Sequence, residues 1–595
     1  MSLTARSPHV LARIAGDGPL EWALVRQPTL SNQQAARTTT RALEALPISP
    51  QDADVQVQAV MAELEALSSG RALTPAGVSW LHVHHVPVRR LIAQVVRKLL
   101  ALSAWEPFAQ SPGQIVPAPH EALVGMRETS SREYVLYTVT WSGIAYLLGA
   151  PAPQNPLRSA QLGELTAPRS DASSLLSAAP STLPQSDVMA LSWSSRHAET
   201  LLPVLEELAR DGRRSVLIDL ATDTGEQCLE PTVSAVRLCP APPGLLSISG
   251  TISGRDLTED GPADGNVFRV RGLGVRLDRL ECLAAAVLET SGGCTQPSWR
   301  ATIRAETWLN GVLAATRPHT VLVCNDTSPL GALAVHAAER HGITTVYVQH
   351  GAWNPGSVAW PALHSRHIVV MGERDVAPAK AWARHPQAEI HVLGQPRFDA
   401  LADLDGDKQR RYLRQLLAAH TWHRPEKIAV WACQPFGSEL LSAQADLILD
   451  GLRKAEGDWG LVITPHPAQS PTALDHVFEQ SRGALVAIAE PRVGARGCLT
   501  GADAVVSAYS TCGIEAALLG IPVLELTLPG RTLGLADHGL AERCGAADDI
   551  ADALSMLSKP ERAARVTADA VCRWRGTSAR DIAQLVIGCS QTHLA

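Results

Sequence analysis

The feature that most constrains the fold is the alternation of short apolar runs with helical segments from residue 187 onward. The apolar runs are continuous, a pattern typical of strands buried on both faces of a parallel sheet. They form two series in tandem, which predict an α/β fold of two Rossmann-like domains facing a cleft. The first series of predicted strands is Val188–Trp193, Ser215–Ala221, Val321–Asn325, Thr344–Gln349, Ile368–Met371 and Ile390–Leu393. The second series is Lys427–Ala432, Leu461–Thr464, Leu485–Ala489, Ala504–Ala508 and Val523–Leu526.

Composition and hydrophobic patterning divide the chain into four parts. At 595 residues the chain is too long for a single hydrophobic core. Residues 1–150 carry amphipathic helical patterns, and residues 151–186 are rich in Pro, Ser and Ala, a composition typical of an exposed linker. We therefore predict a mostly helical N-terminal region, a linker, and two Rossmann-like domains at 187–395 and 396–595. The last helices of the chain are expected to pack back across the cleft.

Composition and charge exclude several classes of protein. The net charge of −7, from 52 basic and 59 acidic residues, provides no basic field for a nucleic-acid backbone. The N-terminus lacks the apolar stretch of a secretion signal, and no run of about 18 apolar residues predicts a membrane span. The 11 cysteines form no CxxC pair, which is typical of a reducing cytoplasm rather than a zinc ribbon or a disulfide framework. We predict a cytoplasmic protein, either free or peripheral at the inner face of the membrane.

The most informative motif follows the predicted strand 504–508, where small polar residues lead into a short helix. Ser510 and Thr511 lie where backbone N–H groups and the helix dipole favour an anion. Gly513 would let a phosphate approach the backbone, and Glu515 in the first turn would accept hydrogen bonds from ribose hydroxyls. The structural alternative is a simple helix start, with Thr511 as the N-cap and Glu515 complementing the dipole.

A second motif, Thr464–Pro467, follows another predicted strand of the same domain. Its two prolines fix the backbone around His466 and project the imidazole at the end of the strand. An imidazole in that place can bind a nucleotide phosphate or stabilise a departing one. The alternative is a loop histidine that caps a carbonyl, but His466 is expected to share the cleft face with Ser510.

Three candidates in the first domain and the crossing segment bear on catalysis. Asp326 ends a predicted strand and is a candidate general base, because a partly desolvated carboxylate can have its pKa raised toward neutrality. Its structural alternative is a loop aspartate that accepts nearby backbone N–H groups. His350 ends the next strand at the predicted cleft and is a second candidate catalytic residue. Arg397, at the crossing between the domains, binds phosphate or pairs with Asp399.

Polar and aromatic residues of the first domain are candidates for binding an acceptor. Ser195, Arg196 and His197 follow the first predicted strand. Trp193 and Trp353 lie beside cleft motifs, and a sugar ring can stack on an indole.

Patterns for a metal are weak in this sequence. His82, His84 and His85 place two imidazoles on one face if the segment is a strand, but we interpret them as packing or solvated residues. The acidic segment 403–407 has too few ligands and the wrong spacing for a calcium loop. No metal site and no cofactor are predicted.

A basic amphipathic helix is predicted over 88–105. Such a helix can lie on an anionic membrane surface, where lipid-linked acceptors are found, or it is a core helix with a solvated face. Its polar side carries Arg90, Gln94, Arg97 and Lys98, and its apolar side Leu91, Ile92, Val95, Val96 and Leu99.

The ordered motifs QHG, GxPRFD, HP and S-T-x-x-x-E-A-x-x-x-G-x-P resemble those of the two-domain (GT-B) glycosyltransferases of bacterial surface-polysaccharide synthesis. The capsule and polysialic acid transferases and the CDP-glycerol glycerophosphotransferases are the most similar groups. The resemblance covers residues 187–595. It implies an inverting, metal-independent transfer from a nucleotide-activated donor to a glycan or glycolipid acceptor.

The resemblance also implies roles for individual residues. The domain 396–595 would bind the donor, with His466 as the His-Pro histidine of the family and Ser510 and Thr511 as its Ser/Thr motif. The domain 187–395 would bind the acceptor and supply a carboxylate base. The acidic-acidic-Gly motif of the polysialyltransferases has no clear copy here, and Asn325-Asp326 is the nearest substitute.

Two other functions fit the same fold. A UDP-sugar 2-epimerase shares the two-domain architecture and a similar G-x-x-E-A…G-x-P-V loop, but it needs a further set of acidic and His residues. A carbohydrate-binding or assembly protein on a transferase scaffold needs no base at all. The sequence identifies neither the nucleotide nor the acceptor.

Overall fold

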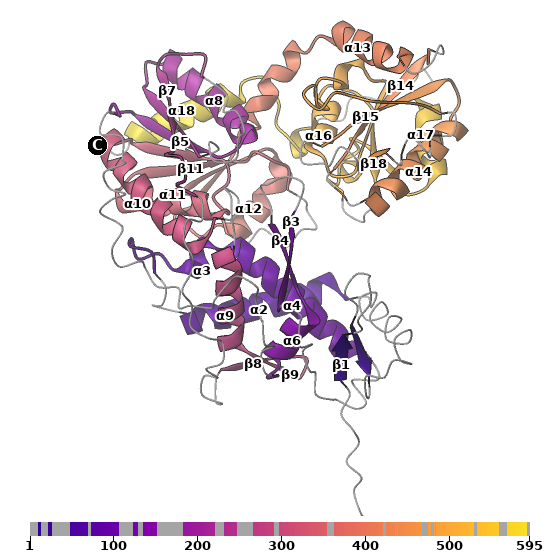
Figure 1. Cartoon of the computed structure of the whole chain (residues 1–595). Helices are drawn as coiled ribbons and strands as arrows, with labels where there is room; N and C mark the ends of the chain where they lie inside the picture. Colours follow the sequence, from indigo (N-terminus) through magenta and orange to yellow (C-terminus); the bar gives the residue numbers. More distant parts are fainter. Residues whose placement is uncertain are drawn as a thin grey trace, which may run out of the picture.

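The structure is a computed structural model of the whole chain. The residues that it describes are 10–13, 22–25, 48–68, 73–105, 123–128, 135–150, 183–220, 231–246, 266–290, 297–353, 362–419, 424–434, 436, 438–466, 474–475, 477, 481, 484–528, 532–557 and 568–591. Most of the predicted linker, residues 151–182, lies outside this set. Two sheet domains lie side by side, and a mostly helical region packs against the first of them (Figure 1).

The first domain is built on a seven-stranded parallel sheet of order β13-β12-β11-β10-β5-β6-β7. Every residue of β5, β6, β10, β11 and β12 is buried, as their continuous apolar sequences predict. The strands are β5 Val188–Ser192, β6 Ser215–Asp219, β7 Val236–Pro240, β10 Thr320–Val323, β11 Thr344–Val348, β12 His367–Val370 and β13 Glu389–Val392.

Helices cover both faces of this sheet. One face packs against α8 (Ser195–Arg210) and the last helix of the chain, α18 (Ser578–Gln591). The other face packs against α10 (Trp299–Thr316), α11 (Pro329–Arg340) and α12 (Val376–Trp382). The chain therefore returns from the second domain to the first at its C-terminal end, as the sequence predicts (Figure 1).

The second domain is built on a six-stranded parallel sheet of order β16-β15-β14-β17-β18-β19. A short 3₁₀ segment, η4 (Pro396–Asp403), connects it to the first domain. Its strands are β14 Lys427–Ala432, β15 Trp459–Thr464, β16 Leu485–Ile488, β17 Ala504–Ser507, β18 Val523–Leu526 and β19 Glu542–Cys544. Its helices are α13 Gly406–Ala418, α14 Ser438–Lys454, α16 Thr511–Leu518 and α17 Ala547–Met556.

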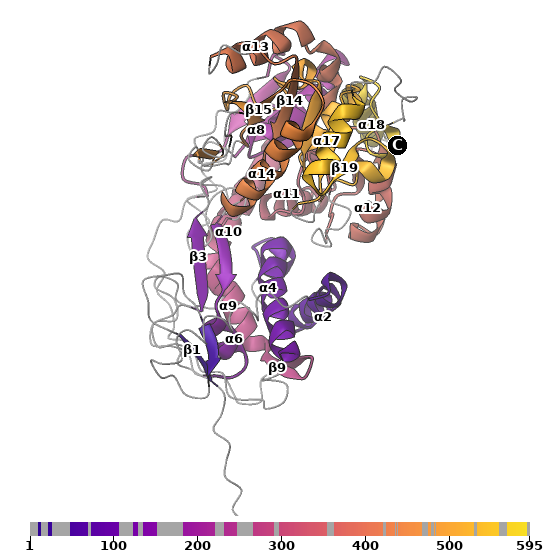
Figure 2. The same ribbon diagram turned by 90° about the vertical axis from the view of Figure 1, so that its right-hand side faces the viewer.

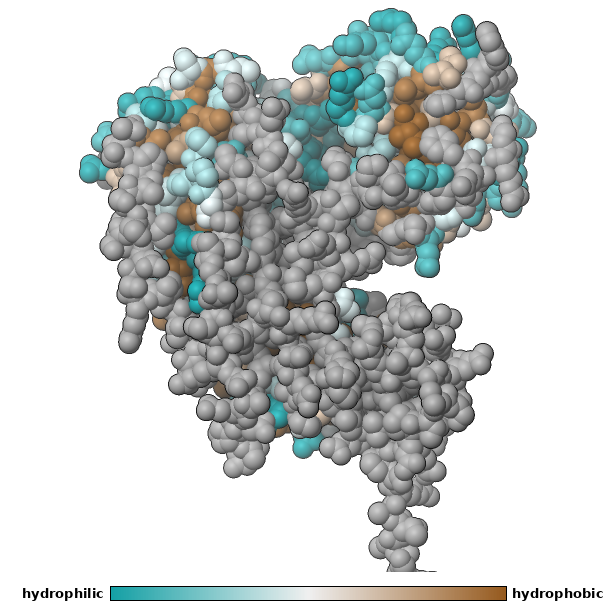
Figure 3. Space-filling model, in the orientation of Figure 1, coloured by the Kyte–Doolittle hydropathy of each residue, from teal (hydrophilic) through white to brown (hydrophobic). Residues whose placement is uncertain are grey.

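Each face of the second sheet has its own apolar core. Helices α14 and α17 pack on one face. Helices α13 and α16 pack on the other face, and the outer side of α13 is hydrophilic (Figure 3). The predicted α/β class with two Rossmann-like domains is confirmed.

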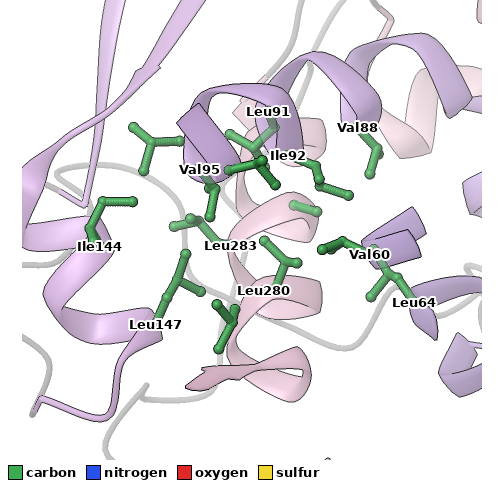
Figure 4. Close-up of a cluster of buried hydrophobic side chains, with 14 of the residues drawn as sticks. Val60, Leu64, Val88, Leu91, Ile92, Val95, Ile144, Leu147, Leu280 and Leu283 are labelled. Atoms are coloured by element: carbon green, nitrogen blue, oxygen red, sulfur yellow. The ribbon is translucent and has the colours of Figure 1, made fainter. Parts of the chain in front are cut away.

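The N-terminal region is a separate helical core that also recruits a later segment of the chain. Buried side chains from α2, α4 and α6 meet those of α9 in one cluster, shown in Figure 4. Its elements are α2 Pro50–Ser68, α3 Trp80–Val83, α4 His85–Ala104, β3 Val124–Glu128, β4 Val135–Val139, α6 Trp141–Leu147, β8 Val267–Val270, β9 Leu273–Arg276 and α9 Leu277–Thr290. A further hairpin joins β1 (Val10–Arg13) to β2 (Trp22–Val25). The range 187–395 thus contains a segment, 267–290, that packs with the N-terminal helices rather than with the first sheet.

The predicted basic amphipathic helix is α4, which lies beside α2 and α9 (Figure 2) and contributes its apolar side to this core. Its apolar side contacts α2 and α9, as Leu91, Ile92 and Val95 show in Figure 4. On its polar side, Oε1 of Gln94 accepts a backbone N–H of β4, and Nζ of Lys98 lies 4.6 Å from the ring centroid of Trp141. The proposed contact of this helix with a membrane surface is therefore contradicted, because its apolar face is already covered by protein. Among the described residues, no helix has the length and apolar character to cross a bilayer.

Candidate active site

Both sheets carry the same topological feature at their carboxyl edges. In the first sheet the chain leaves β5 on one side and returns on its other side at β10, and in the second it does the same at β14 and β17. Ligands of open parallel sheets bind beyond the carboxyl ends of the strands at such a switch point. The segments that follow β5, β11, β15 and β17 therefore define the candidate site.

One contact of this site joins the two domains. Arg196 lies in the first turn of α8, a helix capped by the Ser194 side chain, which accepts the N–H of His197. Nη2 of Arg196 lies 3.0 Å from Nε2 of His466, the residue after Pro465 at the end of β15. Because a guanidinium only donates hydrogen bonds, this His466 nitrogen is the acceptor and the ring is neutral. Burial, together with the charge of Arg196, lowers the pKa of His466 to about 4.

An ion-pair network surrounds Glu515, whose side chain is only 3% exposed. Arg397 Nη2 lies 3.2 Å from Oε1 of Glu515, and Arg496 Nε lies 2.9 Å from Oε2. Arg397 Nη1 also lies 3.8 Å from Oε2 of Glu199 on α8, so it connects the two domains. Among the described residues, Nε of Arg397 and Nη2 of Arg496 are buried without a hydrogen-bond partner. With Arg196, three guanidinium groups face two carboxylates, which leaves a positive charge for an anionic ligand.

Helix α16 begins beside this network at the carboxyl edge of the second sheet. Ser510 is its N-cap, and Oγ of Ser510 accepts the N–H of Cys512 at 3.3 Å. Thr511, considered above as the N-cap, is instead the first helical residue. The two hydroxyl groups therefore lie at the positive end of the helix dipole.

Two predicted contacts of α16 with a nucleotide remain predictions, and the structure gives both residues a role within the protein. A Cβ at Gly513 would lie 3.2 Å from Cδ1 of Leu535, so this glycine permits close packing inside the domain. Each carboxylate oxygen of Glu515 already accepts from an arginine, so a ribose hydroxyl would have to share these oxygens. Glu515 positions the guanidinium groups of Arg397 and Arg496.

His350, after β11, contributes a neutral imidazole from the first domain. Its Nδ1 lies 2.7 Å from the backbone oxygen of Cys324, so Nδ1 carries the ring proton and Nε2 keeps its lone pair. The side-chain amide of Gln395 donates to the carbonyl oxygen of His350 at 3.1 Å. Burial lowers the pKa of His350 to about 4, and the charges of Arg397 and Arg196 act in the same direction. The ring is therefore held in one orientation, with Nε2 as its unprotonated nitrogen.

His197 supports this imidazole rather than binding an acceptor. Its ring packs edge-on between Trp193 and His350, with centroid distances of 4.5 and 4.7 Å. The side chain is buried, and burial lowers the pKa of His197 well below its ordinary value. The predicted acceptor role is contradicted for His197 by this burial, whereas Ser195 is half-buried and Arg196 exposed at the start of the helix.

Asp326 anchors a loop and does not reach the site. The side chain is fully buried, and its Oδ2 accepts the backbone N–H groups of His364 and Ser365, each at 2.8 Å. Burial raises the pKa of Asp326 to about 6. The prediction of a general base at this position is wrong, because a substrate hydroxyl cannot approach a carboxylate enclosed by the loop. The alternative, an aspartate that binds backbone N–H groups, is the one observed.

Trp353 belongs to the apolar core of the first domain. Its ring stacks on Tyr347 at a centroid distance of 6.3 Å and meets Trp382 edge-on at 4.9 Å. The side chain is buried, so the predicted stacking of a sugar on this indole is contradicted.

The sequence reasoning missed two charged residues of the site. Arg496 lies in the segment after β16, which carries no recognised motif, and Glu199 lies on α8. A signal existed for Glu199, because residues three apart on a helix share a face and Arg196 is already at the site. For Arg496, the only signal was its place beyond the carboxyl end of a predicted strand.

Comparison with known proteins gives similarity in architecture at low sequence identity. No family model matches the chain, and no curated protein sequence is similar to it. The UDP-GlcNAc 2-epimerase of Methanocaldococcus jannaschii is 12% identical, with a TM-score of 0.42 over 67% of this chain and 99% of that one. MurG of Acinetobacter baumannii is 12% identical, with a TM-score of 0.36 over 68% and 100% of the two chains. The wall teichoic acid polymerase TagF is 9% identical, with a TM-score of 0.40 over 71% and 94%. Similarity at this level says nothing about the activity of this chain.

Proposed function

We propose that this chain is a glycosyltransferase that moves a sugar, or a polyol phosphate, from a nucleotide-activated donor to a glycan or glycolipid acceptor. One observation carries the proposal. Where the carboxyl edges of the two sheets meet, three arginines exceed the nearby carboxylates by one charge, beside two neutral imidazoles and a helix N-terminus. Planar guanidinium groups are the preferred partners of phosphate oxygens.

The donor diphosphate would bind between the interdomain segment and the second domain. Arg397 and Arg496 each keep a buried N–H group that lacks a hydrogen-bond partner in the described part of the chain. Glu515 fixes both guanidinium groups before the ligand arrives, which lowers the entropy cost of binding. Ser510 and Thr511 at the start of α16 add hydroxyl and backbone donors for the same anion.

The contact between Arg196 and His466 would open to admit the leaving phosphate. Both side chains then donate to it, Arg196 through its guanidinium and His466 through its protonated ring nitrogen. Charge that develops on a departing diphosphate is best stabilised by donors already fixed in position. These groups supply positive charge without a metal, so we expect full activity in EDTA.

His350 is the base that the geometry favours in place of Asp326. In the proposed step, Nε2 of His350 takes the proton of the acceptor hydroxyl, and the acceptor oxygen bonds to the anomeric carbon. The bond between that carbon and the donor phosphate oxygen breaks, and the electron pair leaves with the nucleoside diphosphate. Attack from the opposite face inverts the anomeric configuration. With a polyol-phosphate donor, the same base takes the proton while the acceptor oxygen bonds to the phosphorus that carries the polyol. The bond from that phosphorus to the bridging oxygen of the nucleotide breaks, and a nucleoside monophosphate leaves with the electron pair.

Binding of nucleotide-linked donors tests the proposal directly. Isothermal titration of the full chain with CMP-, CDP-, UDP- and GDP-linked sugars, in EDTA, should give saturable binding with one of them. Arg196→Ala should weaken that binding by about tenfold or more, the cost of a charge-assisted hydrogen bond. The matched control is Arg210→Ala at the other end of α8, where the side chain is 64% exposed and remote from the site.

Two outcomes would replace the proposal with its alternatives. Conversion of UDP-GlcNAc alone to its 2-epimer would identify an epimerase, since that reaction needs no acceptor. Absence of affinity across the whole panel would favour a carbohydrate-binding or assembly protein.

A further inference from the structure

Three imidazoles meet where the N-terminal region contacts the first sheet domain. His82 lies on α3, His336 lies on α11, and His364 lies in the segment before β12. None of the three takes part in the network around Glu515. The segment that carries His364 is held in place because the backbone N–H of His364 donates to Oδ2 of Asp326 at 2.8 Å.

The ring nitrogens of this cluster converge. One nitrogen from each of His82, His336 and His364 lies within 4.8 Å of the other two. Nε2 of His82 and Nδ1 of His364 are 3.0 Å apart. The ring planes are tilted by 51–63° to one another, with centroids 4.4–5.1 Å apart, so the rings do not stack face to face. The nitrogens are therefore close enough to share one ligand, and in its absence His82 and His364 lie at hydrogen-bond distance from each other.

His336 supplies the observation that points to a ligand. Its Nε2 is buried and has no hydrogen-bond partner in the part of the chain that the structure describes. Its other nitrogen, Nδ1, lies 3.6 Å from Oε2 of Glu339. A carboxylate behind the second nitrogen of a histidine is the usual outer partner of a metal-bound imidazole, because it orients the ring and makes the metal-binding nitrogen more basic.

The charges around the cluster fit neutral imidazoles. Burial lowers the pKa of His82 to about 4, and it lowers the pKa of His364 well below its ordinary value. Arg384 acts on both rings in the same direction, and the charge of Glu339 opposes it at His82. A neutral ring with a free lone pair is the form in which histidine binds a metal.

We propose that His82, His336 and His364 bind a zinc ion that ties α3 to α11 and to the segment before β12. Three imidazoles suit Zn²⁺, which takes nitrogen ligands and leaves its fourth position for water. The ion would connect the N-terminal region to the first domain. This site is independent of the proposed transfer reaction.

The neighbouring histidines show why the sequence did not reveal this site. The segment 80–83 is a short helix and not a strand, with His84 as its C-cap and His85 as the first residue of α4, so the three histidines do not share a strand face. Nε2 of His84 lies 3.1 Å from Oγ1 of Thr302 inside the core, a packing role. The two other ligands come from residues more than 250 positions further along the chain.

A second group of possible ligands must be removed before the test. His367, Glu389 and His391 on the adjacent strands β12 and β13 also lie close enough to hold an ion. The experiment therefore uses the full chain without an affinity tag, stripped with EDTA, in a His391→Gln background. Zinc binding is measured by calorimetry, and cobalt binding by its visible absorption, which reports nitrogen ligands directly.

We expect one zinc ion per chain in the His391→Gln protein, with a rise in Tm when zinc is added. Adding His336→Gln should weaken zinc binding by about 100-fold or more and abolish the cobalt band. His341→Gln, an exposed residue just after α11, is the matched control and should change neither. If the His336 variant fails to fold, His82→Gln at a half-buried position replaces it. Zinc binding that survives both substitutions, or that is absent from the His391→Gln protein, overturns the proposal.

Discussion

The carboxyl edges of the two sheets share a topology and differ in charge. At the edge of the first sheet, His197 and Asp326 are buried, and the pKa values of His197 and His350 are lowered by burial. At the edge of the second sheet, Glu515 and Arg496 form an ion pair at 2.9 Å. The first edge therefore carries two buried neutral imidazoles, whereas the buried ion pairs gather around Glu515 at the second edge. Arg196 and Glu199 reach from the first domain toward the second edge, where His466 is also neutral.

This difference assigns separate tasks to the two edges. The neutral imidazole of His350 keeps an unprotonated nitrogen that can accept a proton, whereas the carboxylate of Asp326 is fully buried and binds backbone N–H groups through Oδ2, so a substrate hydroxyl does not reach it. Guanidinium groups held by a buried carboxylate are ready to bind an anion without reorganising. Within the proposed function, the first edge serves the acceptor and the second serves the donor. Four predictions test this division.

The largest expected effect is on catalysis at the first edge. His350→Gln keeps an amide that can donate to the backbone oxygen of Cys324 but removes the basic nitrogen. We expect kcat to fall by about 10²–10⁴-fold, the usual contribution of a general base. Nucleotide affinity should stay within about twofold, because the second edge is unchanged. Transfer at the wild-type rate by this variant would show that His350 is not the general base.

The next effect is on stability at the second edge. Glu515→Ala leaves Arg397 and Arg496 partly buried without their shared carboxylate, so we expect a loss of about 3–5 kcal/mol in the free energy of unfolding. Glu199→Ala is the matched control: that side chain is 42% exposed and 3.8 Å from Arg397, so the loss should stay below about 1 kcal/mol. Urea unfolding of both variants measures the difference. Equal stabilities with lost nucleotide affinity would support the original expectation that Glu515 binds ribose.

The fold was predictable from the sequence wherever strands are covered on both faces. Every predicted apolar run is a strand of one of the two sheets. The strands β7 and β19, which the sequence did not predict, lie at sheet edges and mix exposed with buried residues. The opposite edge strands, β13 and β16, were predicted although they too are only partly buried. The packing of α9 with the N-terminal helices was also not predictable, because it depends on contacts between distant segments.

For the candidate site, the sequence predicted where the residues lie better than it predicted which groups their side chains bind. His350, His466 and Ser510 follow parallel strands, and the carboxyl ends of such strands share one edge, so their positions follow from the motifs. Whether a carboxylate meets a ligand or an internal partner depends on segments remote in sequence. Asp326 is bound by the backbone of His364, and no local pattern indicates this.

A smaller effect should follow from neutralising Asp326 at the first edge. The pKa of this carboxyl is raised to about 6 by burial, so above that pH the folded state holds a buried charge that the unfolded chain exposes at no cost. Asp326→Asn should therefore raise the free energy of unfolding at pH 8 by roughly 1–2 kcal/mol. Turnover should remain within about twofold of wild type. If turnover instead fell by about 10²–10⁴-fold, Asp326 would be the general base after all, and the loop over it would have to open during the reaction.

The smallest effect tests whether His466, which contacts Arg196 across the two edges, is neutral in the folded chain. The pKa of His466 is lowered to about 4 from its ordinary 6.5, so between these values the unfolded chain binds a proton that the folded chain does not. Stability contributed by the neutral ring is therefore complete above pH 6.5 and declines as the pH falls toward 4. His466→Gln cannot titrate, so its unfolding free energy should fall by about 1 kcal/mol less than that of the wild type between pH 8 and pH 5. Parallel pH profiles of the two proteins would mean that His466 has the same pKa in the folded and unfolded states, and would contradict a neutral ring held by burial beside Arg196.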